Sequence, residues 1–210
     1  NEMDTAYVDE LARVIAYEGV PPLADFGVLT SGTTGQPKPL WRREMSWRDF
    51  FDIQNDIFHI NKDTKIFLQG SFSFTGVSNM VIASLWAGGT VVTTSSLRPS
   101  RWMQLIEEYN VDHIYALPTK LRLLVRHCKS KLSSIKYIIA GSQVLDRQLM
   151  EQLQHICPDM EFILYYGASE LNYITYCTGK EWLAREGTVG RPFPTLKIAE
   201  NDNFIYETTN

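Results

Sequence analysis

This sequence has few cysteines, no long hydrophobic run and no excess of basic charge, and each of these features excludes a class of protein. Its three cysteines, Cys128, Cys157 and Cys177, are odd in number and widely spaced. That usage is typical of buried thiols in a reducing compartment, and it fits neither a disulfide framework nor a zinc site. The longest apolar stretch, residues 81–86, is far shorter than the ~18 residues of a transmembrane helix. We therefore expect a cytoplasmic protein with no transmembrane segment.

Charge and composition exclude further classes. The 20 Lys and Arg residues are opposed by 24 Asp and Glu, so the net charge of −4 gives no indication of nucleic-acid binding. The 13 Gly and 9 Pro residues follow no period, which excludes a collagen-like or low-complexity chain. Ten Phe, ten Tyr and five Trp supply ample core material and exclude intrinsic disorder. The length of 210 residues predicts one large domain or two small ones.

Short β-rich runs alternate with amphipathic runs along most of the chain. Strands are predicted at residues 24–29, 65–69, 90–94, 112–117, 136–140 and 161–166. Helices are predicted between them, including residues 77–86, 119–128 and 146–156. This alternation indicates an α/β fold with a mostly parallel sheet and helices on both faces. In such a sheet, ligands bind beyond the carboxyl ends of the strands.

The pattern changes near the end of the chain. Three short strands are predicted there, at residues 172–177, 195–199 and 203–207. We interpret them as the start of a small antiparallel β module. The predicted division therefore separates an α/β part at residues 1–186 from the beginning of a truncated β module at residues 187–210.

Two helix starts are predicted from side chains. Ser46 is expected to cap one helix, because its hydroxyl can accept a hydrogen bond from a main-chain N–H in the first turn. Pro99 is expected to begin another, because its ring presets a helical φ angle. The spacing in this second helix predicts that four side chains face inward: Trp102, Leu105, Ile106 and Tyr109.

A loop rich in glycine and hydroxyl groups follows the first predicted strand. It consists of Thr30, Ser31, Gly32, Thr33, Thr34, Gly35, Gln36, Pro37 and Lys38. The glycines allow close approach of the backbone, so that successive N–H groups can surround an anion. The hydroxyls and Lys38 add donors and a positive charge, and together these features favour a polyphosphate. The spacing is not that of a Walker loop, and a flexible hydroxyl-rich surface turn is the alternative interpretation.

Eight specified positions of this loop match the pattern TSGTTGxPK, and the loop therefore resembles the phosphate loop of the adenylate-forming (AMP-binding) superfamily. That superfamily includes acyl-CoA synthetases, adenylation domains of peptide synthetases and luciferases. Residues 165–170, Tyr-Tyr-Gly-Ala-Ser-Glu, are similar to the family's YGxTE segment, with Ser169 in place of Thr. Residues 187–192 are similar to its GxxGRP turn, and residues 140–145 resemble a GGAPL-like segment, with Ser142 in place of Gly. The resemblance covers about residues 26–198 and is strongest to acyl-CoA synthetases and fatty-acid–CoA ligases.

The chemistry of residues 165–170 agrees with this resemblance. An aromatic ring at a strand end can stack on a purine, the Ser169 hydroxyl can donate to a phosphate, and the Glu170 carboxylate can bind Mg²⁺. The resemblance implies that Glu170 is the metal ligand and that Thr33, Lys38 and Glu170 are catalytic. It also implies a set of ATP-binding residues: Thr30, Ser31, Gly32, Thr33, Thr34, Gly35, Lys38, Gly141, Ser142, Gln143, Tyr165, Tyr166, Gly167, Ala168 and Ser169.

Residues 70–76 align with a family segment that helps to form the acyl pocket, which implies that Ser73 and Phe74 line it. No acidic residue occurs in this segment, where amino-acid-activating domains usually carry an Asp. A buried ammonium without a partner is costly, so we expect an uncharged or apolar acyl group. The run of Trp41, Arg42 and Arg43 predicts an exposed strand edge protected by charge, with guidance of an anionic ligand as the alternative.

The resemblance implies an acid–thiol ligase of fatty-acid metabolism. It would activate a carboxylic acid with Mg·ATP as an acyl-adenylate and transfer the acyl group to the thiol of CoA. The 210 residues would be a fragment of the large N-terminal domain, inactive without the N- and C-terminal parts of the same enzyme. Two alternatives stay open: an amino-acid adenylation domain that serves a carrier protein, and a non-catalytic nucleotide-binding module.

Overall fold

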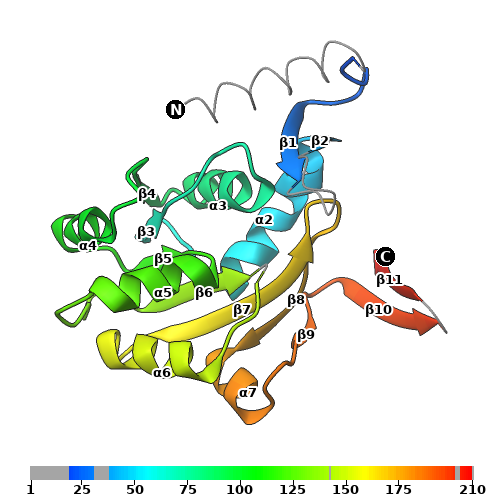
Figure 1. Cartoon of the computed structure of the whole chain (residues 1–210). Helices are drawn as coiled ribbons and strands as arrows, with labels where there is room; N and C mark the ends of the chain where they lie inside the picture. The colour runs from blue at the N-terminus through cyan, green and yellow to red at the C-terminus, as the bar shows by residue number, and fades with distance from the viewer. Residues whose placement is uncertain (1–18, 31–37, 142, 202–203, 210) are drawn as a thin grey trace.

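The centre of the fold is a seven-stranded sheet with the order β4-β3-β5-β6-β7-β8-β9 (Figure 1). The computed structural model describes residues 19–30, 38–141, 143–201 and 204–209. Five neighbouring strands are parallel: β4 (Thr90–Thr93), β3 (Lys65–Leu68), β5 (His113–Tyr115), β6 (Tyr137–Gly141) and β7 (Glu161–Ala168). The predicted mostly parallel sheet is thus confirmed.

Helices cover both faces of this sheet, as predicted. One face packs on α2 (Met45–Ile57) and α3 (Thr75–Trp86). The other face packs on α4 (Pro99–Glu108), α5 (Pro118–His127), α6 (Arg147–Ile156) and α7 (Gly179–Ala184). Both faces of the sheet are apolar because successive side chains of a strand point to opposite faces. In β6, Ile138 faces α4 to α7, whereas the next residue, Ile139, faces α2 and α3. Both side chains are fully buried.

The order of the parallel strands creates a switch point between β3 and β5. From β3 the chain moves through α3 to β4 on one side, and then returns through α4 to β5 on the other side. At such a reversal the connections leave in opposite directions and open a crevice beyond the carboxyl ends of the strands. The segments that follow β3, β5, β6 and β7 therefore meet at one edge of the molecule.

The sheet continues past β7 with two antiparallel strands. β8 (Asn172–Thr178) pairs with β7, and β9 (Arg191–Pro192) pairs with β8. The prediction that the run at 172–177 opens a separate module is therefore wrong, because this strand completes the main sheet. The residues after 195 do form a small antiparallel unit, a hairpin of β10 (Leu196–Asn201) and β11 (Phe204–Thr209). A second hairpin joins β1 (Phe26–Thr30) to β2 (Lys38–Arg42).

Two details of the predicted helices are wrong. Ser46 lies inside the first turn of α2, whose N-cap is Glu44, and its hydroxyl donates to the Arg43 carbonyl at 2.6 Å. Tyr109 follows the last residue of α4 and is 47% exposed. Asn110 takes a positive φ of 49° and turns the chain. As a result Val111 is buried in the core, whereas the helical spacing had predicted that Tyr109 would be buried there.

All three cysteines are free thiols, and Cys157 and Cys177 are buried as expected, whereas Cys128 is only half-buried. Burial raises the pKa of Cys157 to about 12 and that of Cys177 to about 11, so neither thiol ionises at neutral pH. Within the described ranges, no helix has the length and apolar character needed to cross a membrane.

Candidate functional site

The predicted phosphate loop connects the two strands of the β1–β2 hairpin. Thr30 and Lys38, the first and last residues of the loop, face each other as the final pair of the ladder. Five other predicted ATP-binding residues lie outside the described residues: Ser31, Gly32, Thr33, Thr34 and Gly35. The hairpin is held in place because the Leu29 N–H donates to the Ser73 carbonyl at 2.7 Å and because Val28 packs in a small core with Trp47.

The second predicted ATP segment forms the turn between β7 and β8. The ladder shifts register between Tyr166 and Gly167, and a Cβ at Gly167 would lie 2.2 Å from the Asn172 carbonyl oxygen. Only a residue without a side chain fits this close approach of the two strands. Tyr166 is 53% exposed, and Glu170 is exposed at the tip of the turn. Both groups are thus accessible to a ligand.

Direct hydrogen bonds tie the β7–β8 turn to β2 and α2, the two elements that follow the predicted phosphate loop in the sequence. Nη1 of Arg42 donates to the Ser169 carbonyl at 2.5 Å, and Nδ2 of Asn172 donates to the Ser46 carbonyl at 2.9 Å. One contact starts on β2 and the other ends on α2, so both secure the β7–β8 turn beside the hairpin that carries the phosphate loop. The sequence patterns did not predict either contact.

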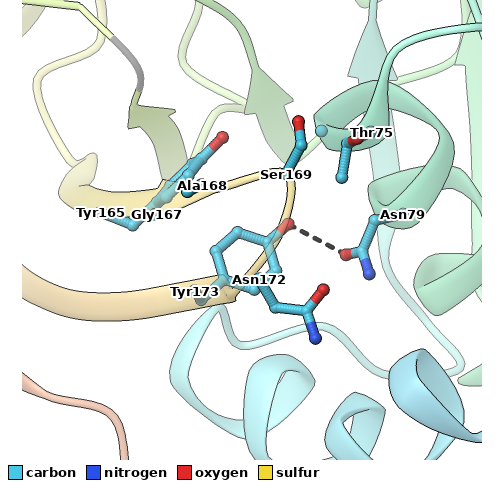
Figure 2. A pocket seen from close by; sticks show the side chains of 9 residues that line it. Thr75, Asn79, Tyr165, Gly167, Ala168, Ser169, Asn172 and Tyr173 are labelled. Atoms are coloured by element: carbon cyan, nitrogen blue, oxygen red, sulfur yellow. Dashed lines mark hydrogen bonds between the residues drawn. The ribbon is translucent and has the colours of Figure 1, made fainter. Parts of the chain in front are cut away.

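A cavity of about 60 Å³ lies between this turn and the start of α3. Figure 2 shows Thr75 and Asn79 of α3 facing the residues of β7 and β8 across it. The hydroxyl of Tyr173 donates to Oδ1 of Asn79 at 3.0 Å, and the Thr75 hydroxyl is buried with no hydrogen-bond partner among the described residues. The described lining consists of Thr75, Gly76, Asn79, Tyr165, Gly167, Ala168, Ser169, Asn172 and Tyr173. It contains no acidic side chain.

Tyr165 is a buried wall of this cavity. Its hydroxyl lies 2.7 Å from that of Tyr115, and burial raises the pKa of Tyr115 well above its usual value. Gly141, at the end of β6, lies directly beneath the Tyr165 ring, because a Cβ there would be 2.5 Å from ring atom Cζ. Of the two predicted aromatic contacts, the structure therefore exposes Tyr166 and buries Tyr165.

The other predicted residues are placed as follows. Ser142 lies outside the described residues. The Gln143 side chain accepts a hydrogen bond from the Thr119 N–H at 3.1 Å and thereby meets the start of α5. Ser73 is exposed, and Phe74 is the N-cap of α3 with 38% of its side chain exposed. Neither borders the cavity in Figure 2, which begins at the next residue along the chain.

The donor set at the turn suits a magnesium nucleotide. Glu170 offers an exposed carboxylate, and hard oxygen ligands of this kind are what Mg²⁺ prefers. Among the described residues, no group of three or more His, Cys, Asp or Glu is arranged as a metal site.

A family comparison tests the resemblance that these motifs indicate. Residues 26–203 match the family described as AMP-binding enzyme. The chain belongs to the AMP-binding enzyme family. The match spans both predicted ATP segments and every strand of the main sheet, so the resemblance stated from the motifs is confirmed.

This chain is similar to two proteins that are described as acyl-CoA ligases. It is 30% identical to a putative long chain fatty acid–CoA ligase, VraA, of Staphylococcus epidermidis, over 94% of this chain and 41% of that protein. It is 26% identical to an uncharacterized acyl–CoA ligase, YhfT, of Bacillus subtilis, over 80% of this chain and 35% of that protein. The chain thus spans less than half the length of these curated relatives.

The fold matches solved structures as well. O-succinylbenzoate coenzyme A synthetase from Bacillus subtilis, solved in complex with ATP and magnesium ion, superposes with a TM-score of 0.75 at 21% identity. The match covers 86% of this chain and 38% of that one. At this identity the likeness establishes the shared α/β fold.

Proposed function

We propose that this chain forms part of an ATP-dependent acid–thiol ligase, in which it supplies much of the nucleotide site and one wall of the acyl pocket. The observation that carries the proposal is the junction of the β1–β2 hairpin with the β7–β8 turn. Hydrogen bonds from Arg42 to Ser169 and from Asn172 to Ser46 hold the β7–β8 turn, which carries the end of the predicted ATP segment at residues 165–170, beside the strands that flank the predicted phosphate loop.

In the proposed reaction, a carboxylate oxygen of the acid attacks the α-phosphorus of ATP. A new P–O bond forms, the bond from the α-phosphorus to the bridging oxygen breaks, and pyrophosphate leaves. A thiol, which we propose is that of CoA, then attacks the acyl carbon, and AMP departs. The protein acts here by positioning the reactants and stabilising charge.

The described residues take distinct parts in this scheme. The strand ends at Thr30 and Lys38 set the place of the phosphate loop, and the exposed ring of Tyr166 stacks on adenine. The hydroxyl of Ser169 donates to the α-phosphate. The carboxylate of Glu170 binds Mg²⁺, which when bound neutralises charge on the phosphates.

The acyl group is proposed to enter the cavity beside Ser169, because the reacting carboxylate must meet the α-phosphate there. An α-amino acid would bring an ammonium into this cavity. No acidic side chain is present in its described lining to pair with that charge, so its desolvation would be uncompensated. This favours an uncharged acyl group over an amino acid, and CoA over a carrier protein that receives amino acids.

The test is acid-dependent exchange of radiolabelled pyrophosphate into ATP by the complete protein that carries this chain. We expect exchange with at least one fatty or aryl acid and none with amino acids. A panel in which amino acids alone stimulate exchange would favour the amino-acid adenylation domain. Tight ATP binding without exchange for any acid would favour the non-catalytic nucleotide-binding module.

Glu170→Gln is the residue-level prediction. We expect exchange to fall on the order of a hundredfold, because the variant loses a charge that the transition state requires, while the thermal unfolding midpoint stays unchanged. Glu151→Gln is the matched control, since Glu151 is an exposed carboxylate on α6, on the other face of the sheet. Full activity of Glu170→Gln would contradict the metal assignment.

A further inference from the structure

Arg42, the last residue of β2, directs its guanidinium at main-chain carbonyls of a distant turn. Nη1 donates to the Ser169 carbonyl at 2.5 Å and lies 3.5 Å from that of Glu170. Nε of the same side chain donates to the Ser46 hydroxyl at 3.2 Å. One side chain thus joins the strand that follows Lys38, the first turn of α2 and the turn between β7 and β8.

The surroundings keep this guanidinium in place. Its central carbon lies 5.8 Å from the ring centroid of Trp47, which is almost fully buried. Burial lowers the pKa of Arg42, while the negative charge of Glu170 acts in the opposite direction. A guanidinium presents its donors in fixed directions within one plane, so it can reach Ser46 and Ser169 at the same time, whereas an ammonium on a flexible stem is not pre-organised to do so.

The choice of acceptors matters for the site. A bidentate pair with the Glu170 carboxylate would occupy both of its oxygens. Arg42 instead contacts the main-chain carbonyls of the two consecutive residues Ser169 and Glu170, and the Glu170 side chain is exposed. The contact therefore fixes the backbone of the turn and leaves the carboxylate available to a ligand.

We propose that Arg42 is a positioning residue of this site, which sets the Ser169 hydroxyl and the Glu170 carboxylate relative to the strand ends at Thr30 and Lys38. This rests on the proposed function as far as catalysis is concerned. Arg42 acts through the turn and makes no contact with the reacting atoms.

The test compares Arg42→Met, Arg42→Lys and Arg43→Met in the complete protein. Arg43→Met is the matched control, because it removes the same charge from the next residue, which is exposed and makes no side-chain hydrogen bond among the described contacts. Three readouts are measured: kcat of pyrophosphate exchange, the Mg²⁺ concentration that gives half-maximal exchange, and the rate of amide hydrogen exchange at residues 168–172.

For Arg42→Met we expect at least a tenfold loss of kcat, at least a threefold higher Mg²⁺ requirement, and faster amide exchange in the turn. Arg42→Lys should fall between this variant and the wild type, and Arg43→Met should stay within twofold of the wild type. The Mg²⁺ requirement distinguishes a positioning role from a general loss of stability. A loss of stability would lower the amount of active protein, but it would leave the Mg²⁺ concentration for half-maximal exchange unchanged. If Arg42→Met does not fold, Arg42→Lys carries the same test.

The outcomes separate the two proposals. If the wild type exchanges pyrophosphate and the Arg42 variants share the Mg²⁺ requirement of Arg43→Met, the positioning role is wrong while the proposed function stands. If the wild type shows no exchange with any acid, the proposed function fails, and amide exchange alone decides the role of Arg42. Equal exchange rates at residues 168–172 in Arg42→Met, Arg42→Lys and Arg43→Met would then overturn it.

Discussion

Replacing Gly141 with Ala would place a methyl group against the aromatic wall of the cavity. The added Cβ would lie 2.5, 2.6 and 2.7 Å from three atoms of the Tyr165 ring, so the ring has to move. The ring has little free space, because Tyr173 lies 4.7 Å and Phe58 6.0 Å from it, centroid to centroid. Overpacking of this kind costs about 1–3 kcal/mol.

Two smaller terms modify this value. Displacement of the ring breaks the Tyr115–Tyr165 hydrogen bond of 2.7 Å, at about 1 kcal/mol. Replacement of Gly by Ala also restricts the unfolded chain, which returns about 0.4–1 kcal/mol. We therefore expect Gly141→Ala to lower the free energy of unfolding by about 1–3 kcal/mol.

The assay is a double-mutant cycle in urea. Gly141→Ala is measured alone and in the background of Tyr165→Leu, where the ring that meets the methyl group is gone. The coupling free energy should exceed about 1 kcal/mol in magnitude, as is usual for residues in direct contact. An unchanged midpoint for Gly141→Ala, or the same loss in both backgrounds, would refute the reasoning.

Two further predictions concern stability. Hydrogen bonds from Arg122 and from the Leu149 N–H lower the pKa of Asp146, the N-cap of α6, so its charged form stabilises the fold above pH 4 and this contribution is lost as the pH falls further. Asp146→Asn keeps the cap and should therefore lower the free energy of unfolding at pH 7, by less than about 1 kcal/mol for so exposed a pair. At pH 2 the free energies of unfolding of variant and wild type should be equal. An equal loss at both pH values would contradict this. Gly190→Ala should cost about 3 kcal/mol in chemical denaturation, because φ is +83° and the new Cβ would lie 2.0 Å from the Tyr176 carbonyl oxygen. Gly187→Ala is its control, with φ +80° and nothing within 4 Å, and should cost about 1–2 kcal/mol; equal losses for the two would show that crowding at Gly190 is irrelevant.

The sequence predicted elements whose signals are local. The spacing of Leu149, Leu153 and Ile156 predicted α6, and all three side chains are buried in one cluster. The sequence did not predict features that depend on contacts with residues far away in the chain. A strand at residues 172–177 would show the same alternating pattern in a separate hairpin or at the side of a parallel sheet. Its pairing with β7 depends on contacts between distant residues, which the local pattern does not specify.

The same limit applies to the site. The glycines, hydroxyls and carboxylate of the two ATP segments are visible in the sequence because the motifs are contiguous. The sequence predicted Arg42 as charge on a strand edge, or as guidance for an anionic ligand, but not as a link to the turn, since its partners Ser169 and Glu170 lie 127 and 128 residues away. Thr75 and Asn79 border the cavity because α3 turns them toward it, a property of the helix orientation rather than of any motif.

The buried tyrosines have a consequence for how activity would depend on pH. Burial raises the pKa of both Tyr115 and Tyr173 well above the usual value, so their hydroxyls stay neutral from acidic to mildly alkaline solution. Neither hydroxyl therefore contributes an ionisation over the pH range in which enzymes are usually assayed. A pKa found in a pH–rate profile of the complete protein would belong to a group other than these two tyrosines.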